Sequence, residues 1–472
     1  MVYLYYMRFI IGLLIVLCGV VWGGVYYVES KPITEHIKTA TEVAAKYADS
    51  GSILSILPDL AGFKGERVYL LLLQNSHELR PTGGFIGNFG IVRVKDGQIL
   101  DTQFEGSEYL DARIPKGTLV PRSPKPIATY MEQGYLYFRD GNWNPDFKET
   151  AQTLVQLYAQ SHGDYADKID GVIAVNTDVA SEIMKIVGPI TVSGVTFTAD
   201  NIIDRLQYEV EIAWLNKAIS KHERKAIVDE LFDAIKDRLS SMSFEQLYAL
   251  VLRMEELAKE KHIIGFDFRE QVQEVYEGLG YAGLLRSTNS DFIGVVDTNL
   301  GGFKTDRVME RTWRYTISSR DTEGLRSELR LRYKNPGVKD YRTRDYRSYT
   351  RIYLPLGVHS VTVVGDSVFD ENLKRDFDVY DDGDFTVVGF FHVDKLQTEN
   401  EYVISYEQPE SVFSQYSRGL YELYVWKQPG MHSPTLTVTH SFDRPVVDDT
   451  TTSPFQTPFN IDRDVTLRTL LQ

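Results

Sequence analysis

The side chains best suited to chemistry gather in one segment, QNSHELRPTGGFIGNFG, which runs from Gln74 to Gly90. It combines amides, an imidazole, a carboxylate, a guanidinium and a hydroxyl, contributed by Gln74, Asn75, His77, Glu78, Arg80 and Thr82. An arginine binds phosphate through two parallel hydrogen bonds, and the glycines that follow let backbone amides approach an anion closely. The segment therefore predicts an anion site. One alternative stays open: Glu78 and Arg80 pair with each other, and the glycines only permit a tight turn.

A phosphate clamp built on Arg80 is completed by a second cation. Three arginines further along the chain are candidates for this role: Arg93, Arg113 and Arg122. The last two lie in residues 111–126, a stretch with four prolines that is long enough to form a lid or the wall of a site.

A second polar cluster is RDGNWNPDF, which begins at Arg139. Asn142, Trp143 and Asn144 stand just before a predicted helix start and are candidates to line a pocket that faces a sugar or a phosphate. In the alternative interpretation, Trp143 fills the core and Asp146 caps the helix behind it.

Several common sites are absent from the sequence. No G-x-S-x-G motif and no second histidine for a zinc-protease helix occur, and the aspartate-rich DVYDDGDF lacks the ligand spacing of a calcium loop and is typical of a hairpin turn. One cysteine excludes a Cys-based zinc site, so we predict no resident metal from ligand spacing. With 51 Lys+Arg against 66 Asp+Glu and a net charge of −15, a nucleic-acid partner is not expected.

The first thirty residues predict a membrane anchor. Residues 9–28 contain no charge, and a helix of about 20 apolar residues spans a bilayer. Tyrosines and a tryptophan flank the span, and Arg8 precedes it while Glu29 follows, which places the N-terminus in the cytoplasm. A cleaved signal peptide is the rival interpretation. We expect a single-pass protein of the cell membrane whose bulk is extracytoplasmic.

These residues require elements to position them, and the pattern of the chain predicts two domains. Buried strands alternate with helices up to about residue 290, which is typical of a layered α/β domain with a mainly buried central sheet. Short alternating strands follow, as in SELRLRYKN, and indicate an all-β sandwich. The predicted parts are a cytoplasmic stub (1–8), a transmembrane helix (9–28), a stalk helix and linker (29–60), the α/β domain (61–290), the β-sandwich (291–445) and an extended tail (446–472).

The chain also resembles a known bacterial family, the domain-of-unknown-function family 4012. The resemblance rests on YLLLLQNSHELRPTGGFIGNFG, NWNPDF, IDGVIAVNTD, VGPITVSG, VVDTNLGGFKTD and YRSYTRIYLPLG, and it extends from about residue 61 to residue 440. The family implies an architecture rather than an activity.

A more distant resemblance is to the LytR-CpsA-Psr (LCP) phosphotransferases, which transfer lipid-diphosphate-linked glycans to the cell wall. A buried strand that leads to an arginine, here Arg80, and the pattern GVIAVNTDVASEIMKIVGPITV carry it. The Arg-Ser-Asp-like and Pro-Arg-Asp motifs of that family are replaced here by Arg80-Pro81-Thr82 and by GSEYLDARIP. If the chain is an enzyme, this resemblance implies phosphoglycosyl transfer with Mg²⁺, with Arg80 on the diphosphate and Glu78 or Asp111 as metal ligand or base.

Two functions therefore remain open on the sequence. The first is an envelope protein that binds or transfers a polyprenyl-diphosphate-linked glycan or a cell-wall polymer at Arg80. The second is a non-catalytic cell-surface scaffold or adhesion protein in which the polar cluster at Arg80 is structural. The second predicts that the polar cluster near Arg80 is internally paired and has no cavity beside it.

Overall fold

The computed structural model describes residues 53–115, 117–209, 223–319, 324–365, 377–449 and 458–472. The predicted stub, the transmembrane helix and most of the stalk lie outside these ranges. None of the helices in the described part has the length and apolar character that a bilayer crossing requires.

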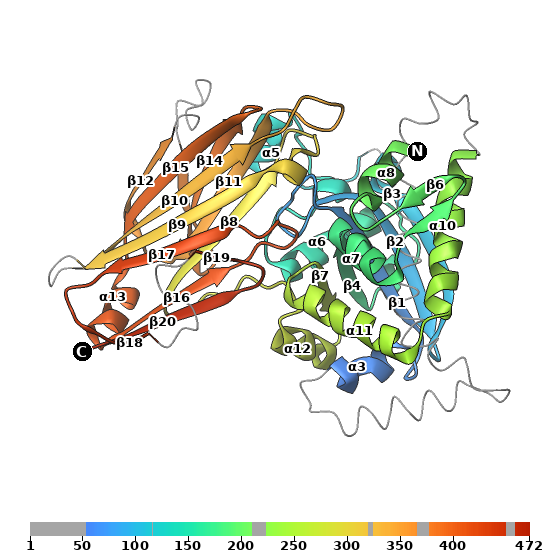
Figure 1. Ribbon diagram of the computed structural model, residues 1–472, viewed down its shortest axis with the longest axis horizontal. Coiled ribbons are helices and arrows are strands. Elements are labelled where there is room, and N and C mark those ends of the chain that lie inside the picture. Colours follow the sequence, from blue (N-terminus) through green and yellow to red (C-terminus); the bar gives the residue numbers. More distant parts are fainter. Residues whose placement is uncertain (1–52, 116, 210–222, 320–323, 366–376, 450–457) are drawn as a thin grey trace. The chain divides into compact units, whose positions relative to one another are not determined.

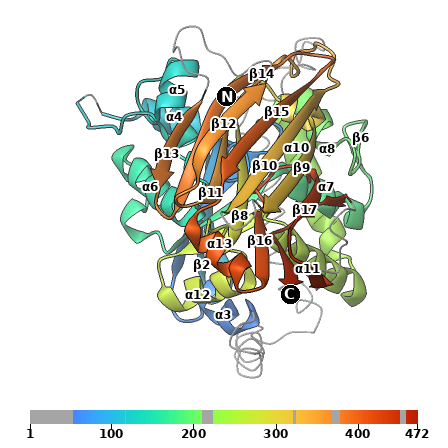
Figure 2. The ribbon, with the colours of Figure 1, turned by 90° about the vertical axis from the view of Figure 1, so that its left-hand side faces the viewer.

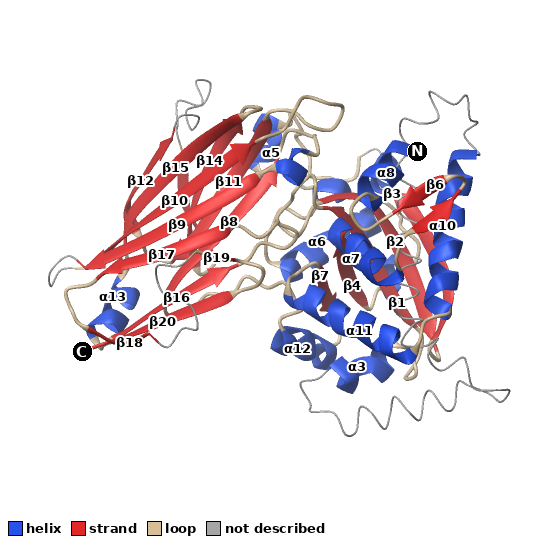
Figure 3. Cartoon of the chain, in the orientation of Figure 1, coloured by secondary structure: helices blue, strands red, loops and turns tan. Residues whose placement is uncertain are grey.

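The chain forms two compact units. Of the described residues, the α/β unit comprises those from Ile53 to Asn75 together with Thr82–Arg122 and Tyr135–Leu284, and the β-unit comprises those of Ser76–Pro81, Ser123–Gly134 and Leu285–Gln472. Helices are confined mostly to the first unit, as the blue and red ribbons of Figure 3 show. The prediction of a mixed α/β region followed by a largely β region is thus confirmed.

The α/β unit is built on a five-stranded mixed sheet with the order β3-β2-β1-β4-β7 (Figure 1). Its strands are β1 (Arg67–Asn75), β2 (Phe85–Lys95), β3 (Gln98–Gly106), β4 (Gly171–Asn176) and β7 (Ile263–Asp267). The pair β1 and β4 is parallel and the other neighbours are antiparallel. All seven residues from Val68 to Gln74 are buried, as is typical of a central strand that is covered on both faces.

Helices and a small hairpin complete this unit. They are α3 (Ile53–Leu60), α4 (Ser107–Ala112), η1 (Phe138–Asp140), α6 (Phe147–Gln160), η2 (Ala166–Lys168), α7 (Thr177–Val187), β5 (Ile190–Val192), β6 (Val195–Phe197), α8 (Ile202–Tyr208), α10 (Glu223–Ser240), α11 (Phe244–Lys259) and α12 (Glu270–Leu279). Leu71 and Leu73 face the core that β1 shares with α7, α10 and α11. Phe89 packs edge-on against Phe138 and Tyr158.

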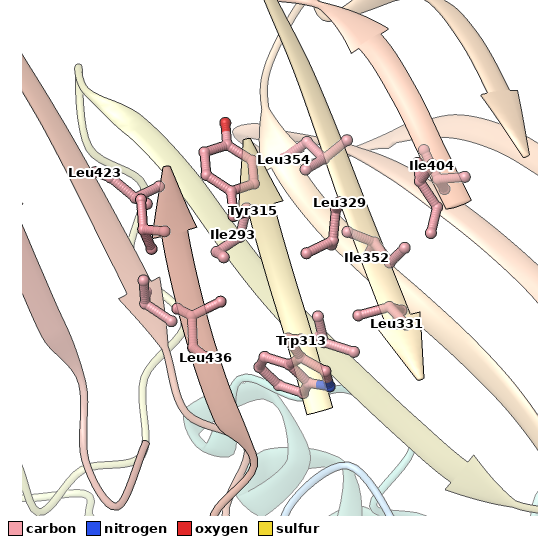
Figure 4. Packing of buried hydrophobic residues seen from close by; sticks show 14 of the residues in the cluster. Ile293, Trp313, Tyr315, Leu329, Leu331, Ile352, Leu354, Ile404, Leu423 and Leu436 are labelled. Atoms are coloured by element: carbon pink, nitrogen blue, oxygen red, sulfur yellow. The ribbon is translucent and has the colours of Figure 1, made fainter. Parts of the chain in front are cut away.

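The β-unit consists of two sheets that enclose one core. The first has the order β13-β14-β11-β8-β16-β20-β18, and the second has the order β12-β15-β10-β9-β17-β19. Figure 2 looks onto the second sheet, where β12, β15, β10, β9 and β17 lie side by side. Side chains from both sheets gather between them, among them Ile293, Trp313, Leu329 and Ile352 (Figure 4).

The strands of the first sheet are β8 (Asp291–Asn299), β11 (Tyr346–Pro355), β13 (Asp378–Asp382), β14 (Phe385–Asp394), β16 (Leu420–Trp426), β18 (Val446–Asp449) and β20 (Val465–Leu471). Those of the second are β9 (Glu310–Ser319), β10 (Leu325–Asn335), β12 (His359–Gly365), β15 (Thr398–Glu407), β17 (Thr435–Ser441) and β19 (Phe459–Asn460). The short helices of this unit are α5 (Lys125–Tyr130), η4 (Thr305–Val308) and α13 (Glu410–Ser417). Residues 465–471, within the stretch for which the sequence suggests an extended tail, pair with β16.

Candidate functional site

The polar segment after β1 is divided between the two units. Gln74 and Asn75 end β1, and Thr82 precedes β2, so these three residues belong to the α/β unit. The intervening residues 76–81, which include Glu78 and Arg80, belong to the β-unit. The six site residues that are adjacent in the sequence are thus divided three and three between the two units.

Arg80 is held inside the β-unit by internal partners. Its side chain is 2% exposed, and its guanidinium lies 3.3 Å from the Glu78 carboxylate. The same guanidinium donates hydrogen bonds to the carbonyl oxygens of Leu79 and Asn299. The carbonyl oxygen of Arg80 in turn accepts a hydrogen bond from the Gln428 side chain. Buried charges of this kind are stable only when paired, so the arginine and Glu78 depend on each other.

Leu79, between these two charged residues, is part of the β-unit core. It is 1% exposed and belongs to the same hydrophobic cluster as Trp313 and Leu331. Its N–H donates to the Asp306 carboxylate at 2.9 Å, and its carbonyl oxygen accepts from the Asn299 N–H at 3.0 Å. Residues 76–81 are therefore a structural insertion into the β-unit, anchored by one apolar side chain and by backbone hydrogen bonds.

The residues that stay in the α/β unit form a small buried amide–hydroxyl cluster. The Thr82 hydroxyl accepts hydrogen bonds from the Gln74 amide at 2.8 Å and from the Asn142 amide at 3.1 Å. Asn142 also donates to the carbonyl oxygen of Gly84 at 2.9 Å. All three side chains are at most 2% exposed, so these bonds fasten the start of β2 to the chain before α6.

The other members of the second polar cluster are only partly buried. Trp143 and Asn144 are both half-buried. The Asn144 side chain accepts a hydrogen bond from the Asp146 N–H at 2.9 Å, and Asp146 caps α6 by accepting from the N–H groups of Lys148 and Glu149. The predicted cap is confirmed, and Asn144 supports it.

The three arginines predicted as second cations each have a local contact of their own. Arg93 on β2 pairs with Glu66 at 2.8 Å, and Arg113 after α4 pairs with Glu105. The Arg122 guanidinium lies 4.8 Å from the centre of the Tyr135 ring. All three belong to the α/β unit and Arg80 belongs to the β-unit, so the clamp stays a prediction.

Asp111 lies in a different polar cluster, in the α/β unit. One of its carboxylate oxygens accepts the Phe138 N–H at 2.8 Å, and the other lies 3.6 Å from the Arg139 guanidinium. Burial raises the pKa of the Asp111 carboxyl to about 6, although the Phe138 N–H and Arg139 both act to lower it. Arg139 also lies 3.5 Å from Asp140, and a third of its side chain is exposed.

Arg139 and Asp140 are thus site candidates that sequence reasoning missed. They begin the RDGNWNPDF segment, from which only the asparagines and the tryptophan were selected. The sequence feature that could have indicated them is an arginine next to an aspartate, directly before Gly141, in a segment whose other residues indicate a buried loop. Only the fold reveals their proximity to Asp111, because 27 residues separate Asp111 from Phe138.

A second missed group is a charged network in the core of the β-unit. Arg311 lies 2.8 Å from Asp297 and 2.6 Å from Asp306, and all three side chains are at most 2% exposed. Asp297 also accepts from the Thr350 hydroxyl, which lies 2.8 Å from the ring of His392. With every member buried, this network supports the core rather than presenting groups to a substrate.

The described residues contain no group of three or more His, Cys, Asp or Glu side chains arranged to hold a metal ion. Glu78 and Asp111, the two carboxylates proposed as magnesium ligands, belong to different units. No step through Mg²⁺ follows from these residues.

Comparisons with known proteins place part of the chain in a family. Residues 64–210 match the model described as "Protein of unknown function (DUF4012)". The comparison with curated proteins gave no significant match.

Two solved structures are similar at a distance. One is TagV of B. subtilis, an LCP-family protein, with 14% sequence identity, 48% of this chain and 85% of that chain covered, and a TM-score of 0.22. The other is described as a candidate nutrient binding protein of Legionella pneumophila, with 9% identity, 38% and 72% coverage and a TM-score of 0.22. Scores this low carry no argument about activity. The family match does not depend on them: it covers residues 64–210, the first part of the stretch from about 61 to 440 over which the sequence resembles the DUF4012 family.

Proposed function

We propose that this protein is a single-pass, membrane-anchored envelope protein whose bulk is extracytoplasmic, and that it acts as a non-catalytic scaffold or binding protein. The polar segment around Arg80 then serves the fold. The apolar stretch 9–28 and its flanking aromatic residues support the anchor.

One observation carries the choice between the two functions left open by the sequence. An arginine that receives a lipid diphosphate must present its N–H groups to that ligand. The Arg80 side chain is 2% exposed; its Nη1 donates to the carbonyl oxygens of Leu79 and Asn299, and its Nη2 donates to Glu78. Removing it would leave the Glu78 carboxylate buried without its cation, which costs roughly 3–5 kcal/mol.

The test is a comparison of Arg80→Lys with wild type in the full-length protein. Lysine keeps the charge and loses the forked geometry. We expect the midpoint of thermal unfolding to fall, and polyprenyl diphosphate to show no saturable binding that depends on residue 80. Arg93→Lys, at a partly exposed ion pair, is the matched control and should leave the midpoint nearly unchanged.

The opposite pattern would refute this role for Arg80. In that pattern Arg80→Lys unfolds at the wild-type temperature while the affinity for polyprenyl diphosphate falls tenfold or more.

The membrane setting has its own experiment. Protease added to intact cells should digest the chain beyond the predicted span, and the fragments should be the same size as those from lysed cells. Full protection in intact cells and digestion after lysis would place the bulk on the cytoplasmic side and end the proposal.

A second candidate function is the binding or transfer of a lipid-diphosphate-linked glycan at the cluster of Asp111 and Arg139. It is favoured by the Asp111 pKa of about 6, which suits a general base, and by the partial exposure of Arg139. Asp111→Asn retains the acceptor for the Phe138 N–H and removes the charge. Transfer lowered at least a hundredfold with unchanged unfolding would support this candidate, and an unchanged rate would exclude Asp111 as the base. Glu105→Gln is the control.

A further inference from the structure

Two neighbouring loops of the β-unit carry an excess of positive charge. Residues 300–308 and 336–347 together contain six Lys and Arg residues and three Asp residues, in a chain with a net charge of −15. One of those aspartates, Asp306, is buried and paired with Arg311 in the core. We call these two loops the arginine plate.

Hydrogen bonds hold the two loops of the arginine plate together. The Leu300 N–H donates to the carbonyl oxygen of Arg347, and the Lys304 N–H donates to that of Arg342, both at 2.8 Å. The Thr305 hydroxyl donates to the carbonyl oxygen of Arg344 and accepts from the N–H of the same residue, both at 3.1 Å. The backbone under the cations is therefore fixed.

Aromatic rings hold the guanidinium groups of the plate. Arg344 lies 5.0 Å from the centre of the Phe303 ring, and Arg347 lies 5.5 Å from that of Phe391, which also stacks on Tyr130. A guanidinium on a ring face keeps its N–H groups at the edge, where they can still donate. Phe303 is 37% exposed, so this surface reaches solvent.

Among the described residues, Arg344 and Arg347 have no acidic partners, unlike two cations of β10 in the same unit. On β10, Arg332 pairs with Glu399 and Lys334 pairs with Glu310. Within the described part of the chain, no carboxylate lies at ion-pair distance from Arg344 or Arg347. Their positive charge is therefore available to an external anion, whereas the charges on β10 are compensated.

We propose that the arginine plate binds a soluble polymer of oxyanion groups, phosphate or carboxylate. Arginine fits both groups through paired hydrogen bonds, and fixed donors lower the entropic cost of binding. Each guanidinium alone binds weakly, and a polymer that supplies successive anions engages both at once. Anionic lipid surfaces also attract clusters of Lys and Arg, so the experiment sets vesicles against the soluble polymer. The proposal does not depend on the role of Arg80.

The experiment uses the full-length protein in nanodiscs of neutral lipid, with long-chain polyphosphate and polyglutamate as probes. We expect at least one polymer to bind, with an affinity that falls steeply with salt. The double variant Arg344→Gln/Arg347→Gln should raise the dissociation constant about tenfold at 0.1 M salt, because two charge-assisted contacts are lost. The two probes show which oxyanion is preferred.

The matched control is Arg332→Gln/Lys334→Gln, which removes the same charge from β10. It should change the dissociation constant less than twofold, and thermal unfolding should show that both double variants are folded. Three results would overturn the proposal: no binding of either polymer, equal losses in the two double variants, or anionic vesicles that displace the polymer at equal phosphate concentration.

Discussion

Asp291 at the start of β8 is a fully buried carboxyl group with three hydrogen-bond donors around it. One of its oxygens accepts hydrogen bonds from the hydroxyls of Tyr315 and Tyr421, and the other accepts from the Phe292 N–H. Burial is the largest effect and raises the pKa of Asp291 to about 6, while the hydrogen bonds act to lower it. Folding therefore favours the protonated form.

This raised pKa predicts how stability depends on pH. A carboxyl with a higher pKa in the folded state stabilises the protein below its unfolded pKa, near 4, and this contribution is lost as the pH rises through about 6. The loss amounts to roughly 3 kcal/mol of unfolding free energy. Asp291→Asn should reduce the slope between pH 4 and pH 6 in urea unfolding followed by tryptophan fluorescence, and the contribution of Asp111, whose pKa is also raised to about 6, should remain. The exposed control Asp462→Asn should keep the slope, and an unchanged slope in Asp291→Asn would contradict the assignment.

The buried position of some polar residues could be predicted from the sequence. On β9, Arg311 has the same alternation as Trp313, Tyr315 and Ile317, and all four face the core. The period of two predicts this inward position, yet an arginine is expected outside unless its partners are known. Those partners, Asp297 and Asp306, come from other elements, so the sequence alone could not supply them.

At the scale of elements, local signals predicted most of the α/β unit. The turn Asp96-Gly97 joins β2 to β3, and both residues have positive φ angles, 47° and 69°, as a two-residue hairpin turn requires. Helix α7 begins at Thr177, directly after Asn176, whose side chain caps it by accepting the Asp178 N–H. These features depend on a few neighbouring residues, which is why they can be predicted from the sequence.

Gly90 on β2 illustrates where the local interpretation stops. The sequence suggested that the glycines after Arg80 let backbone amides approach an anion. A Cβ atom at residue 90 would lie 1.8 Å from the Phe104 ring of β3, so the missing side chain makes room for that ring. The role of Gly90 therefore depends on Phe104, the residue opposite it on β3. Because strand pairing brings together residues from different segments, the residues next to Gly90 in the sequence do not reveal this role.

Gly90→Ala should therefore destabilise the α/β unit by about 1–3 kcal/mol, because the new methyl group forces the Phe104 ring out of its position. The double variant Gly90→Ala/Phe104→Leu should recover part of the loss. Gly278→Ala on α12 is the control, since nothing lies within 4 Å of that added Cβ. Urea unfolding measures all three variants, and wild-type stability of Gly90→Ala would disprove the packing argument.

At the scale of the whole molecule, the β-unit includes two segments from the first third of the chain, 76–81 and 123–134. The first supplies Leu79 to the core and a backbone donor to the buried Asp306 carboxylate. A continuous β domain from residue 291 onward was the simplest arrangement that the sequence suggested. The contribution of residues 76–81 escapes prediction because it depends on contacts between residues more than two hundred positions apart.

A fragment of residues 285–472 should therefore be less stable than the same unit in the full chain. Loss of a buried leucine side chain alone costs about 2–5 kcal/mol. A synthetic peptide of residues 74–84 should raise the thermal midpoint of the fragment in a concentration-dependent manner, because it binds only the folded form. The peptide with Leu79→Ser is the control and should have little effect. A fragment as stable as the full chain, with no response to the peptide, would refute this.

The insertion of Leu79 into the β-unit also bears on how the protein is made. Ser76–Pro81 emerges from the ribosome long before the residues of β8, β9 and the other strands that surround Leu79 have been synthesised. During this interval the leucine and its charged neighbours have no place to dock, so closing the β-unit is a late event that joins distant parts of the chain. Chaperones and quality-control proteases meet the nascent polypeptide in this window, and mutations at residues 78–80 should reduce its yield in cells.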